Sequence, residues 1–195
     1  GDLAWLRACD LDAALRQHAE AGGLVLGICG GYQMLGLEIH DPLGVEGGGY
    51  QEGLGLLPVS TAFTQEKTLC SSAGTTLQLE GSFASLSNLD VAGYQIHMGQ
   101  TTLEGGMSFC LFADAGEDGC VAGTVMGTYL HGLFDSVPFT QALIDMLLAR
   151  KGITGARINA QDRAARREQQ LDVLADTLRT SLDMDLVYRI LEEGI

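Results

Sequence analysis

Cys29 stands among glycines directly after a short apolar run, a setting in which a cysteine can act as a nucleophile. The run at 24–26 reads Leu-Val-Leu, and the segment 27–31 reads Gly-Ile-Cys-Gly-Gly. This order predicts a buried strand, a tight turn and the start of a helix, the arrangement known as a nucleophile elbow. The free N–H groups of a helix N-terminus favour a thiolate, and we expect the N–H of Gly30 to bind an oxyanion.

The glycines at 27, 30 and 31 are expected to give this turn its backbone freedom and to leave room for a substrate. The alternative interpretation is a small buried cysteine in a glycine turn, which requires no chemistry. A later histidine favours the catalytic interpretation, because a thiol nucleophile needs a base.

The chain offers four histidines as that base. His131 directly follows a run of residues with strand character, 123–130, and active sites of open α/β sheets collect at strand ends. We therefore take His131 as the base, the alternative being a structural histidine. His97 also lies at a strand end. The sequence is equally compatible with a His97 that lines the same pocket and with one that has a structural role. His18 and His40 are expected at the surface.

The elements that position these residues predict an α/β fold, with a mostly parallel central sheet flanked by helices. Gly22 and Gly23 are expected to end the first helix, and a break at Asp10 would divide that helix into two. A doubly wound domain usually starts with a strand, so we expect the first strand or strands to precede Gly1. The predicted elements are a helix at 3–21, strands at 24–26, 75–79, 93–99, 107–112 and 120–129, a glycine-rich loop with short extended pieces at 41–58, and helices at 139–149, 161–182 and 185–191.

Composition narrows the class of protein. Eleven basic against 25 acidic residues give a net charge of −14, which argues against nucleic acid or an anionic membrane as partner. The 46% hydrophobic content supports a sizeable core in the main domain, 1–156, and we expect a helical extension at 157–195. Lys67 is the only lysine or arginine between Arg16 and Arg150. No apolar run approaches a membrane span and no export signal is recognisable, so we expect a cytoplasmic protein without a membrane partner.

The cysteines indicate reduced thiols. Five cysteines stand at irregular spacings without a CxxC pair, so neither a zinc site nor a disulfide framework is predicted, and we expect no metal. They are Cys9, Cys29, Cys70, Cys110 and Cys120.

Residues 27–33, Gly-Ile-Cys-Gly-Gly-Tyr-Gln, resemble the G-x-C-x-G-x-Q elbow of the class I (triad) glutamine amidotransferases. Three further segments, 52–58 (EGLGLLP), 93–99 (GYQIHMG) and 127–134 (GTYLHGLF), make the chain similar to the cobalamin-type members of that family. The tail at 171–191 is similar as well, so the resemblance covers essentially the whole chain. It implies a flavodoxin-like fold that lacks its first strand or strands here.

The resemblance also implies an activity. Cys29 would attack the side-chain amide of glutamine, His131 would protonate the leaving ammonia and then activate water, and Gln33 would contact the bound glutamine. Gly30 and His97 would line the substrate pocket. In the family, ammonia passes to a preceding synthetase domain that uses ATP and magnesium to amidate adenosylcobyrinic acid a,c-diamide. No G-x-x-x-x-G-K-[ST] pattern occurs in these 195 residues, so we expect no cofactor in this chain.

One departure from the wider family leaves a question open. Many triad amidotransferases carry a glutamate two residues after the histidine, and here that position is Leu133. The cobalamin-type members share this departure, which leaves the group that orients His131 unidentified. Asp135 is near it in sequence.

Alternative functions remain at this point. A related amidotransferase supplies ammonia to a Mur-ligase-like partner that amidates a cell-wall precursor, and it shares the elbow and an ending like GTYLHG. The segments at 52–58 and 93–99 favour the cobalamin branch. An inactive fragment or interaction domain, and a cysteine hydrolase on a similar elbow, are the other interpretations.

Overall fold

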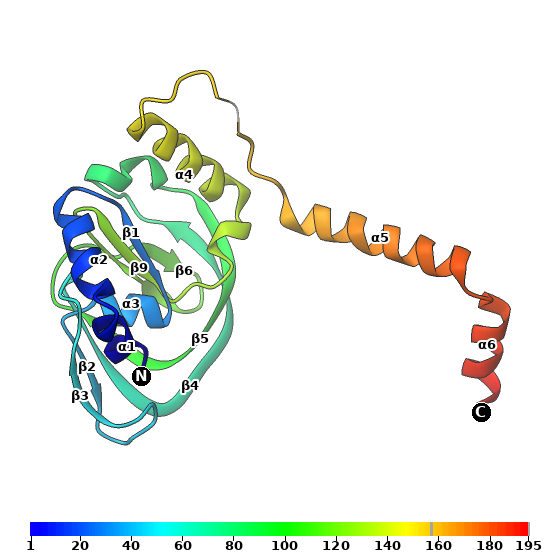
Figure 1. The fold of residues 1–195 in the computed structure, drawn as a ribbon, viewed down its shortest axis with the longest axis horizontal. Coiled ribbons are helices and arrows are strands. Elements are labelled where there is room, and N and C mark those ends of the chain that lie inside the picture. The colour runs from blue at the N-terminus through cyan, green and yellow to red at the C-terminus, as the bar shows by residue number, and fades with distance from the viewer. Residues whose placement is uncertain (157, 195) are drawn as a thin grey trace. The chain divides into compact units, whose positions relative to one another are not determined.

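The computed structural model describes residues 1–156 and 158–194. It divides into two compact units, Gly1–Ile158 and Asn159–Ile195. The first residue of the predicted helical extension, 157, lies outside the described residues. All of the predicted site residues belong to the first unit, drawn from blue to yellow in Figure 1.

The α-helices of the first unit lie where the sequence predicts them, with one predicted helix divided in two. The predicted helix at 3–21 is two helices, α1 (Asp2–Ala8) and α2 (Leu11–Glu20), because Asp10 between them adopts a left-handed conformation with φ 56°. α3 (Gly30–Leu35) follows the elbow. α4 (Val137–Arg150) starts where the Ser136 side chain accepts a hydrogen bond from the N–H of Phe139. Two 3₁₀ helices, Gly81–Leu86 and Leu133–Asp135, complete the set.

The strands form two sheets. The smaller has the order β1 (Val25–Ile28), β9 (Val125–Thr128), β8 (Cys120–Ala122). The larger has the order β3 (Gly49–Glu52), β2 (Glu38–Asp41), β4 (Val59–Thr76), β6 (Cys110–Phe112), β7 (Gly116–Asp118), and β5 (Asp90–Leu103) also pairs with β4.

The α/β class with flanking helices is confirmed, but the expectation of mostly parallel strands needs correction. Only β1–β9 and β2–β4 are parallel among the described pairs; the other strand pairs are antiparallel. Short connections explain three of the antiparallel pairs, β2–β3, β6–β7 and β8–β9, because a parallel pair needs a crossover of a dozen or more residues. The predicted strand at 120–129 is such a case: Gly123 and Thr124 turn the chain, with φ 61° at Gly123, and produce the antiparallel pair β8–β9.

The longest strands were largely missed by the sequence analysis. β4 begins at Val59, well before the predicted strand at 75–79, and β5 extends past 93–99 to Leu103. The two run antiparallel along most of their length, with a register shift between the pairs at Phe63 and Thr68. Figure 1 shows this pair as a long curved ribbon at one side of the unit.

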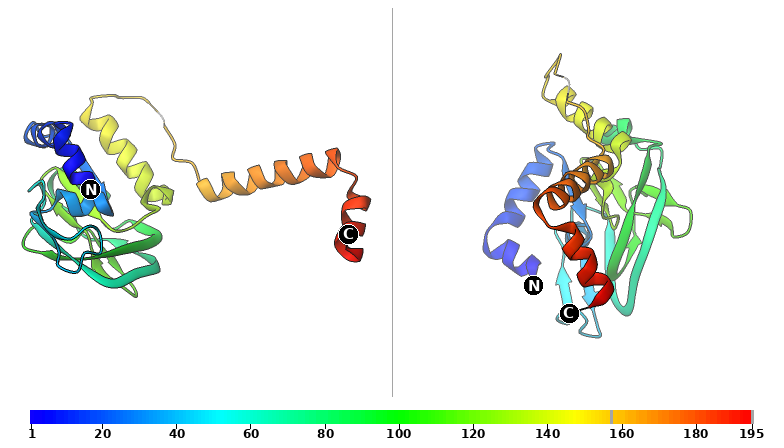
Figure 2. Two further views of the ribbon diagram at one scale, coloured as in Figure 1. Left: turned by 60° about the horizontal axis from the view of Figure 1, so that its bottom comes forward. Right: turned by 90° about the vertical axis from the view of Figure 1, so that its right-hand side faces the viewer.

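Two buried clusters hold the layers together. In the right-hand view of Figure 2, α1 and α2 lie on one side of the strands. One cluster joins α4, the 3₁₀ helix at 81–86 and β9, with fully buried Phe83, Met126 and Phe139. The other joins α1, β1, α3 and β4, and includes Tyr32, Leu57 and Val59. Because β9 contributes to both clusters, the strand that leads to His131 is fixed from both sides.

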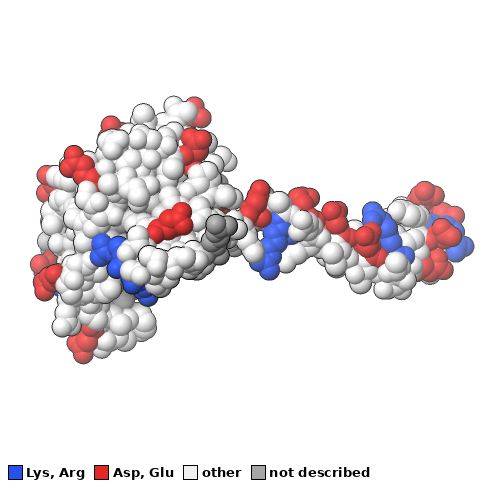
Figure 3. All heavy atoms as spheres, turned by 90° about the horizontal axis from the view of Figure 1, so that it is seen from above, with Lys and Arg blue, Asp and Glu red and all other residues white. Residues whose placement is uncertain are grey.

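The second unit contains α5 (Arg163–Ser181) and α6 (Met184–Glu193), close to the predicted 161–182 and 185–191. Both begin with an aspartate whose carboxylate accepts a backbone N–H: Asp162 and Asp183. Figure 3 shows acidic and basic side chains along this unit, whereas the visible face of the first unit carries mainly acidic ones. Within the described residues, neither unit has a helix whose length and apolar character would suit a membrane span.

Candidate active site

The predicted elbow is present, and its backbone strain lies on the cysteine itself. Cys29 has φ 53° and ψ −113°, between β1 and the first residue of α3. A non-glycine residue in this region is uncommon and is concentrated at functional sites. Gly27 serves packing instead, because a Cβ there would come within 2.8 Å of the Gly31 backbone. A Cβ at Gly30 would meet nothing within 4 Å, which agrees with an open space above the turn.

The surroundings of the Cys29 sulfur favour the neutral thiol over the thiolate. Burial raises the pKa of the Cys29 thiol above its usual value; the N–H of Gly30 lowers it, and the nearby charge of Glu46 raises it further. The thiol also lies 3.5 Å from the carbonyl oxygen of Ile96, a possible hydrogen-bond acceptor. The N–H at the start of α3 therefore lowers the pKa of Cys29 as expected, but burial raises it more. Cys29 thus depends on a base to lose its proton.

His131 follows β9 and is fastened to β5. Its N–H donates to the carbonyl of Tyr94 at 2.8 Å, and the Tyr94 N–H donates back at 3.1 Å. The two rings are stacked, with centroids 5.0 Å apart and planes at 7°. The Nε2 atom of His131 is buried and has no hydrogen-bond partner among the described residues. An unpaired buried ring nitrogen is costly, and a substrate or water is the partner that would satisfy it.

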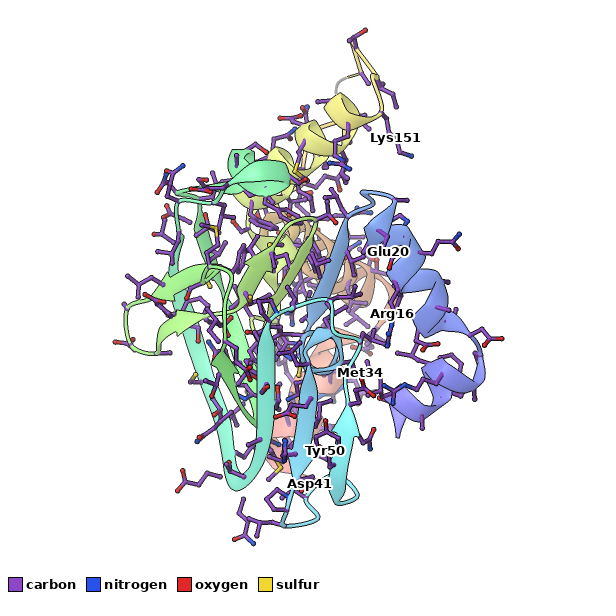
Figure 4. All side chains as sticks on the ribbon, turned by 90° about the vertical axis from the view of Figure 1, so that its left-hand side faces the viewer. Arg16, Glu20, Met34, Asp41, Tyr50 and Lys151 are labelled. Atoms are coloured by element: carbon purple, nitrogen blue, oxygen red, sulfur yellow. The ribbon has the colours of Figure 1, made fainter. Side chains whose placement is uncertain are left out.

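One cavity of about 490 Å³ brings all five predicted site residues together. This is large enough for a small-molecule ligand. The predicted residues at its wall are Cys29, Gly30, Gln33, His97 and His131. Apolar side chains also line it, among them Met34 of α3, which is labelled in Figure 4.

Gln33 and His97 are both tied to Tyr129. The Gln33 amide donates to the Tyr129 hydroxyl at 3.1 Å, and the Gln33 side chain is buried. The His97 ring stacks on Tyr129 at 3.7 Å, and its Nδ1 is 2.7 Å from the carbonyl of Gly99. Burial lowers the pKa of His97, while Gly99 and Asp118 act the other way and His131 adds to the lowering. This arrangement favours a neutral ring with Nδ1 donating to Gly99, held as part of the wall.

The sequence analysis missed three charged residues at this cavity, Asp2, Glu46 and Lys67. Glu46 lies on a loop that is held in shape by Asp41. The Asp41 carboxylate accepts hydrogen bonds from the N–H groups of Val45, Glu46 and Gly48 at 2.7–2.8 Å. Although burial alone would raise the pKa of Asp41, these hydrogen bonds lower it. Asp41 lies at the end of β2 in Figure 4.

Lys67 comes from the irregular part of the β4–β5 pair. The register shift between the Phe63 and Thr68 pairs frees this stretch of β4 from the regular ladder. The sequence singles out Lys67 in one way: no other lysine or arginine occurs between Arg16 and Arg150. The local sequence pattern, however, did not indicate that Lys67 lies at the same cavity as Cys29.

The remaining histidines lie outside the cavity. His18 is exposed, with Nε2 3.3 Å from the carbonyl of Leu24. His40 is exposed, 3.0 Å from the Glu38 carboxylate and edge-on to the Tyr50 ring. Within the described ranges, no group of three or more His, Cys, Asp or Glu side chains could hold a metal ion.

Residues 1–139 match the family model described as a CobB/CobQ-like glutamine amidotransferase domain. Over its whole length the chain is 41% identical to a protein of Lachnoclostridium phytofermentans named "Cobyric acid synthase", of which it covers 40%. It is 44% identical over 99% of its length to the protein of that name in Citrobacter koseri, covering 39% of it. Among solved structures, that of PurLQS from Thermotoga maritima shares the fold, with a TM-score of 0.50, 13% identity, and coverage of 70% of this chain and 68% of that one. The chain thus spans about 40% of the length of these curated relatives.

Proposed function

This chain belongs to the CobB/CobQ-like glutamine amidotransferase family, and from that premise we propose that it hydrolyses glutamine with Cys29 as nucleophile and His131 as acid–base residue. The observation that carries the assignment is that the strained cysteine and the unpaired Nε2 of His131 border one cavity. The known relatives support a glutaminase over an interaction domain or a general hydrolase.

The proposed reaction has two halves. His131 takes the proton of the Cys29 thiol, and the sulfur attacks the side-chain amide carbon of glutamine. The N–H of Gly30 stabilises the oxyanion, His131 protonates the departing nitrogen, and ammonia leaves a thioester behind. A water molecule then gives a proton to His131 and attacks the thioester. The C–S bond breaks, glutamate leaves, and the proton returns to the sulfur.

We further propose that the ammonia serves the amidation of a corrin, adenosylcobyrinic acid a,c-diamide, by a synthetase domain that uses ATP and magnesium. The relatives named cobyric acid synthase support this over the cell-wall alternative. The test incubates the full-length protein with the corrin, ATP, magnesium and glutamine. Amidated corrin with stoichiometric glutamate is expected, and glutamine consumption that never yields amidated corrin contradicts the assignment.

The charges at the cavity suit the free amino acid. Glutamine carries an ammonium and a carboxylate at the end opposite its amide, and both Glu46 and Lys67 border the cavity from exposed positions. We assign Lys67 to the carboxylate and Glu46 to the ammonium, with the amide directed inward to Cys29.

Replacing Lys67 by methionine is expected to raise KM for glutamine about fivefold with little change in kcat, because exposed ion pairs contribute up to about 1 kcal/mol. Wild type should discriminate against 4-aminobutanamide, which lacks the carboxylate, and the variant should lose that discrimination. Steady-state kinetics of both amides measure this.

Lys151→Met is the matched control, because Lys151, which directly follows α4, does not border the cavity and lies near the top of Figure 4, away from Met34 and Asp41. An unchanged KM in Lys67→Met, or an equal rise in the control, contradicts the assignment of Lys67.

A further inference from the structure

The group that orients His131 is not the residue two positions later. Leu133 stands there, fully buried in the core cluster around Phe139, and its side chain cannot accept a hydrogen bond. An imidazole that must first take a proton from Cys29 and then give one to a leaving group needs a fixed ring plane. The question left by the sequence is therefore what fixes it.

Tyr94 meets His131 through both backbone and ring. The reciprocal backbone hydrogen bonds at 2.8 and 3.1 Å set the two residues opposite each other. The rings then lie parallel within 7°, with centroids 5.0 Å apart, inside the range of favourable aromatic stacking. This contact covers one face of the imidazole and opposes rotation about its Cβ–Cγ bond.

Gly93 makes this approach possible. A Cβ at that position would lie 1.9 Å from the carbonyl oxygen of His131, so only glycine permits the backbone pairing. Gly93 and Tyr94 belong to β5, whereas His131 follows β9 of the other sheet. The pair thus joins the two sheets at the residue on which the chemistry depends.

We propose that Tyr94 is a positioning residue for His131, whose stacked ring holds the imidazole plane and directs Nε2 into the Cys29 cavity. This inference rests on the proposed glutaminase function. It is the ring face that matters, so the tyrosine hydroxyl is dispensable.

The experiment compares Tyr94→Leu, Tyr94→Met and Tyr94→Phe with wild type in the full-length protein. The two non-aromatic variants should lose about 10- to 100-fold in kcat, the scale of a small misplacement of a catalytic group, with KM for glutamine within twofold. Tyr94→Phe should stay within twofold of wild type. Tyr50→Leu is the matched control, because Tyr50 contacts His40 with ring centroids 4.9 Å apart but does not border the cavity.

A second comparison separates positioning from a general structural effect. In a His131→Ala background, Tyr94→Leu should cause no further loss of the residual activity, since there is no ring left to orient. A further loss of the same size in that background overturns the inference. So does full activity of Tyr94→Leu, or a Tyr94→Phe variant as impaired as Tyr94→Leu.

Different results would overturn the proposed glutaminase function and the positioning role of Tyr94. A wild-type protein without glutaminase activity overturns the proposed function and this inference with it. An active wild type whose kcat is insensitive to Tyr94→Leu and Tyr94→Met overturns only the role of Tyr94.

Discussion

Replacing Cys29 by serine is expected to lower glutamine hydrolysis by at least about 10³-fold, because loss of a nucleophile removes the covalent route. A serine hydroxyl is much less acidic than a thiol, and burial, which already raises the pKa of the Cys29 thiol, opposes its ionisation further. Glutamate release by the full-length protein measures the effect.

Two controls accompany this variant. Cys70→Ser changes a cysteine of similar, partial burial outside the cavity and should leave activity unchanged. Amidation with added ammonium in place of glutamine should survive in Cys29→Ser, since it bypasses the thioester. Retained glutamine hydrolysis in Cys29→Ser is incompatible with its role as nucleophile.

Replacing His131 by alanine is expected to reduce kcat by about 10²- to 10⁴-fold, the usual contribution of general acid–base catalysis. The loss should be large because the Cys29 environment favours the neutral thiol, so the sulfur depends on a base. Steady-state hydrolysis of glutamine is the measurement. His40→Ala is the control, at an exposed histidine outside the cavity.

His97 is the competing base, and the same assay decides between them. Its ring is stacked on Tyr129 and its Nδ1 is engaged by Gly99, so His97→Ala should act mainly through the cavity wall and cost less than His131→Ala. The opposite order, with His97→Ala inactive and His131→Ala active, would transfer the acid–base role to His97.

Local patterns were sufficient for the elbow, and for the presence of a strand before His131 but not for the turn that divides the predicted strand at 120–129 into β8 and β9. An apolar run followed by glycines around Cys29 predicts strand, turn and helix, because each of these preferences is short-range. The structure has β1, the turn and α3 in that order. The place of the strain differs: φ is positive at Cys29 itself and not at its glycine neighbours.

Local sequence patterns do not predict which distant strands pair with each other. β4 between Phe63 and Cys70 is rich in Thr, Gln, Glu and Lys and lacks a clear apolar alternation, so it does not read as a strand; its pairing with β5 on either side of the register shift makes it part of one. The placement of Lys67 depends on that pairing and on its irregular register. The stacking of Tyr94 on His131 likewise joins residues from separate sheets, which sequence spacing does not reveal.

The central claim is that Cys29 attacks glutamine in the cavity it shares with His131, and covalent labelling by a glutamine analogue tests it most directly. The full-length protein is treated with 6-diazo-5-oxo-norleucine with and without excess glutamine, and the modified peptide is identified by mass spectrometry. The account predicts one adduct on Cys29, prevented by glutamine and slowed in His131→Ala. Labelling at Cys9 or Cys70 instead, or labelling of Cys29 that glutamine does not prevent, would contradict it.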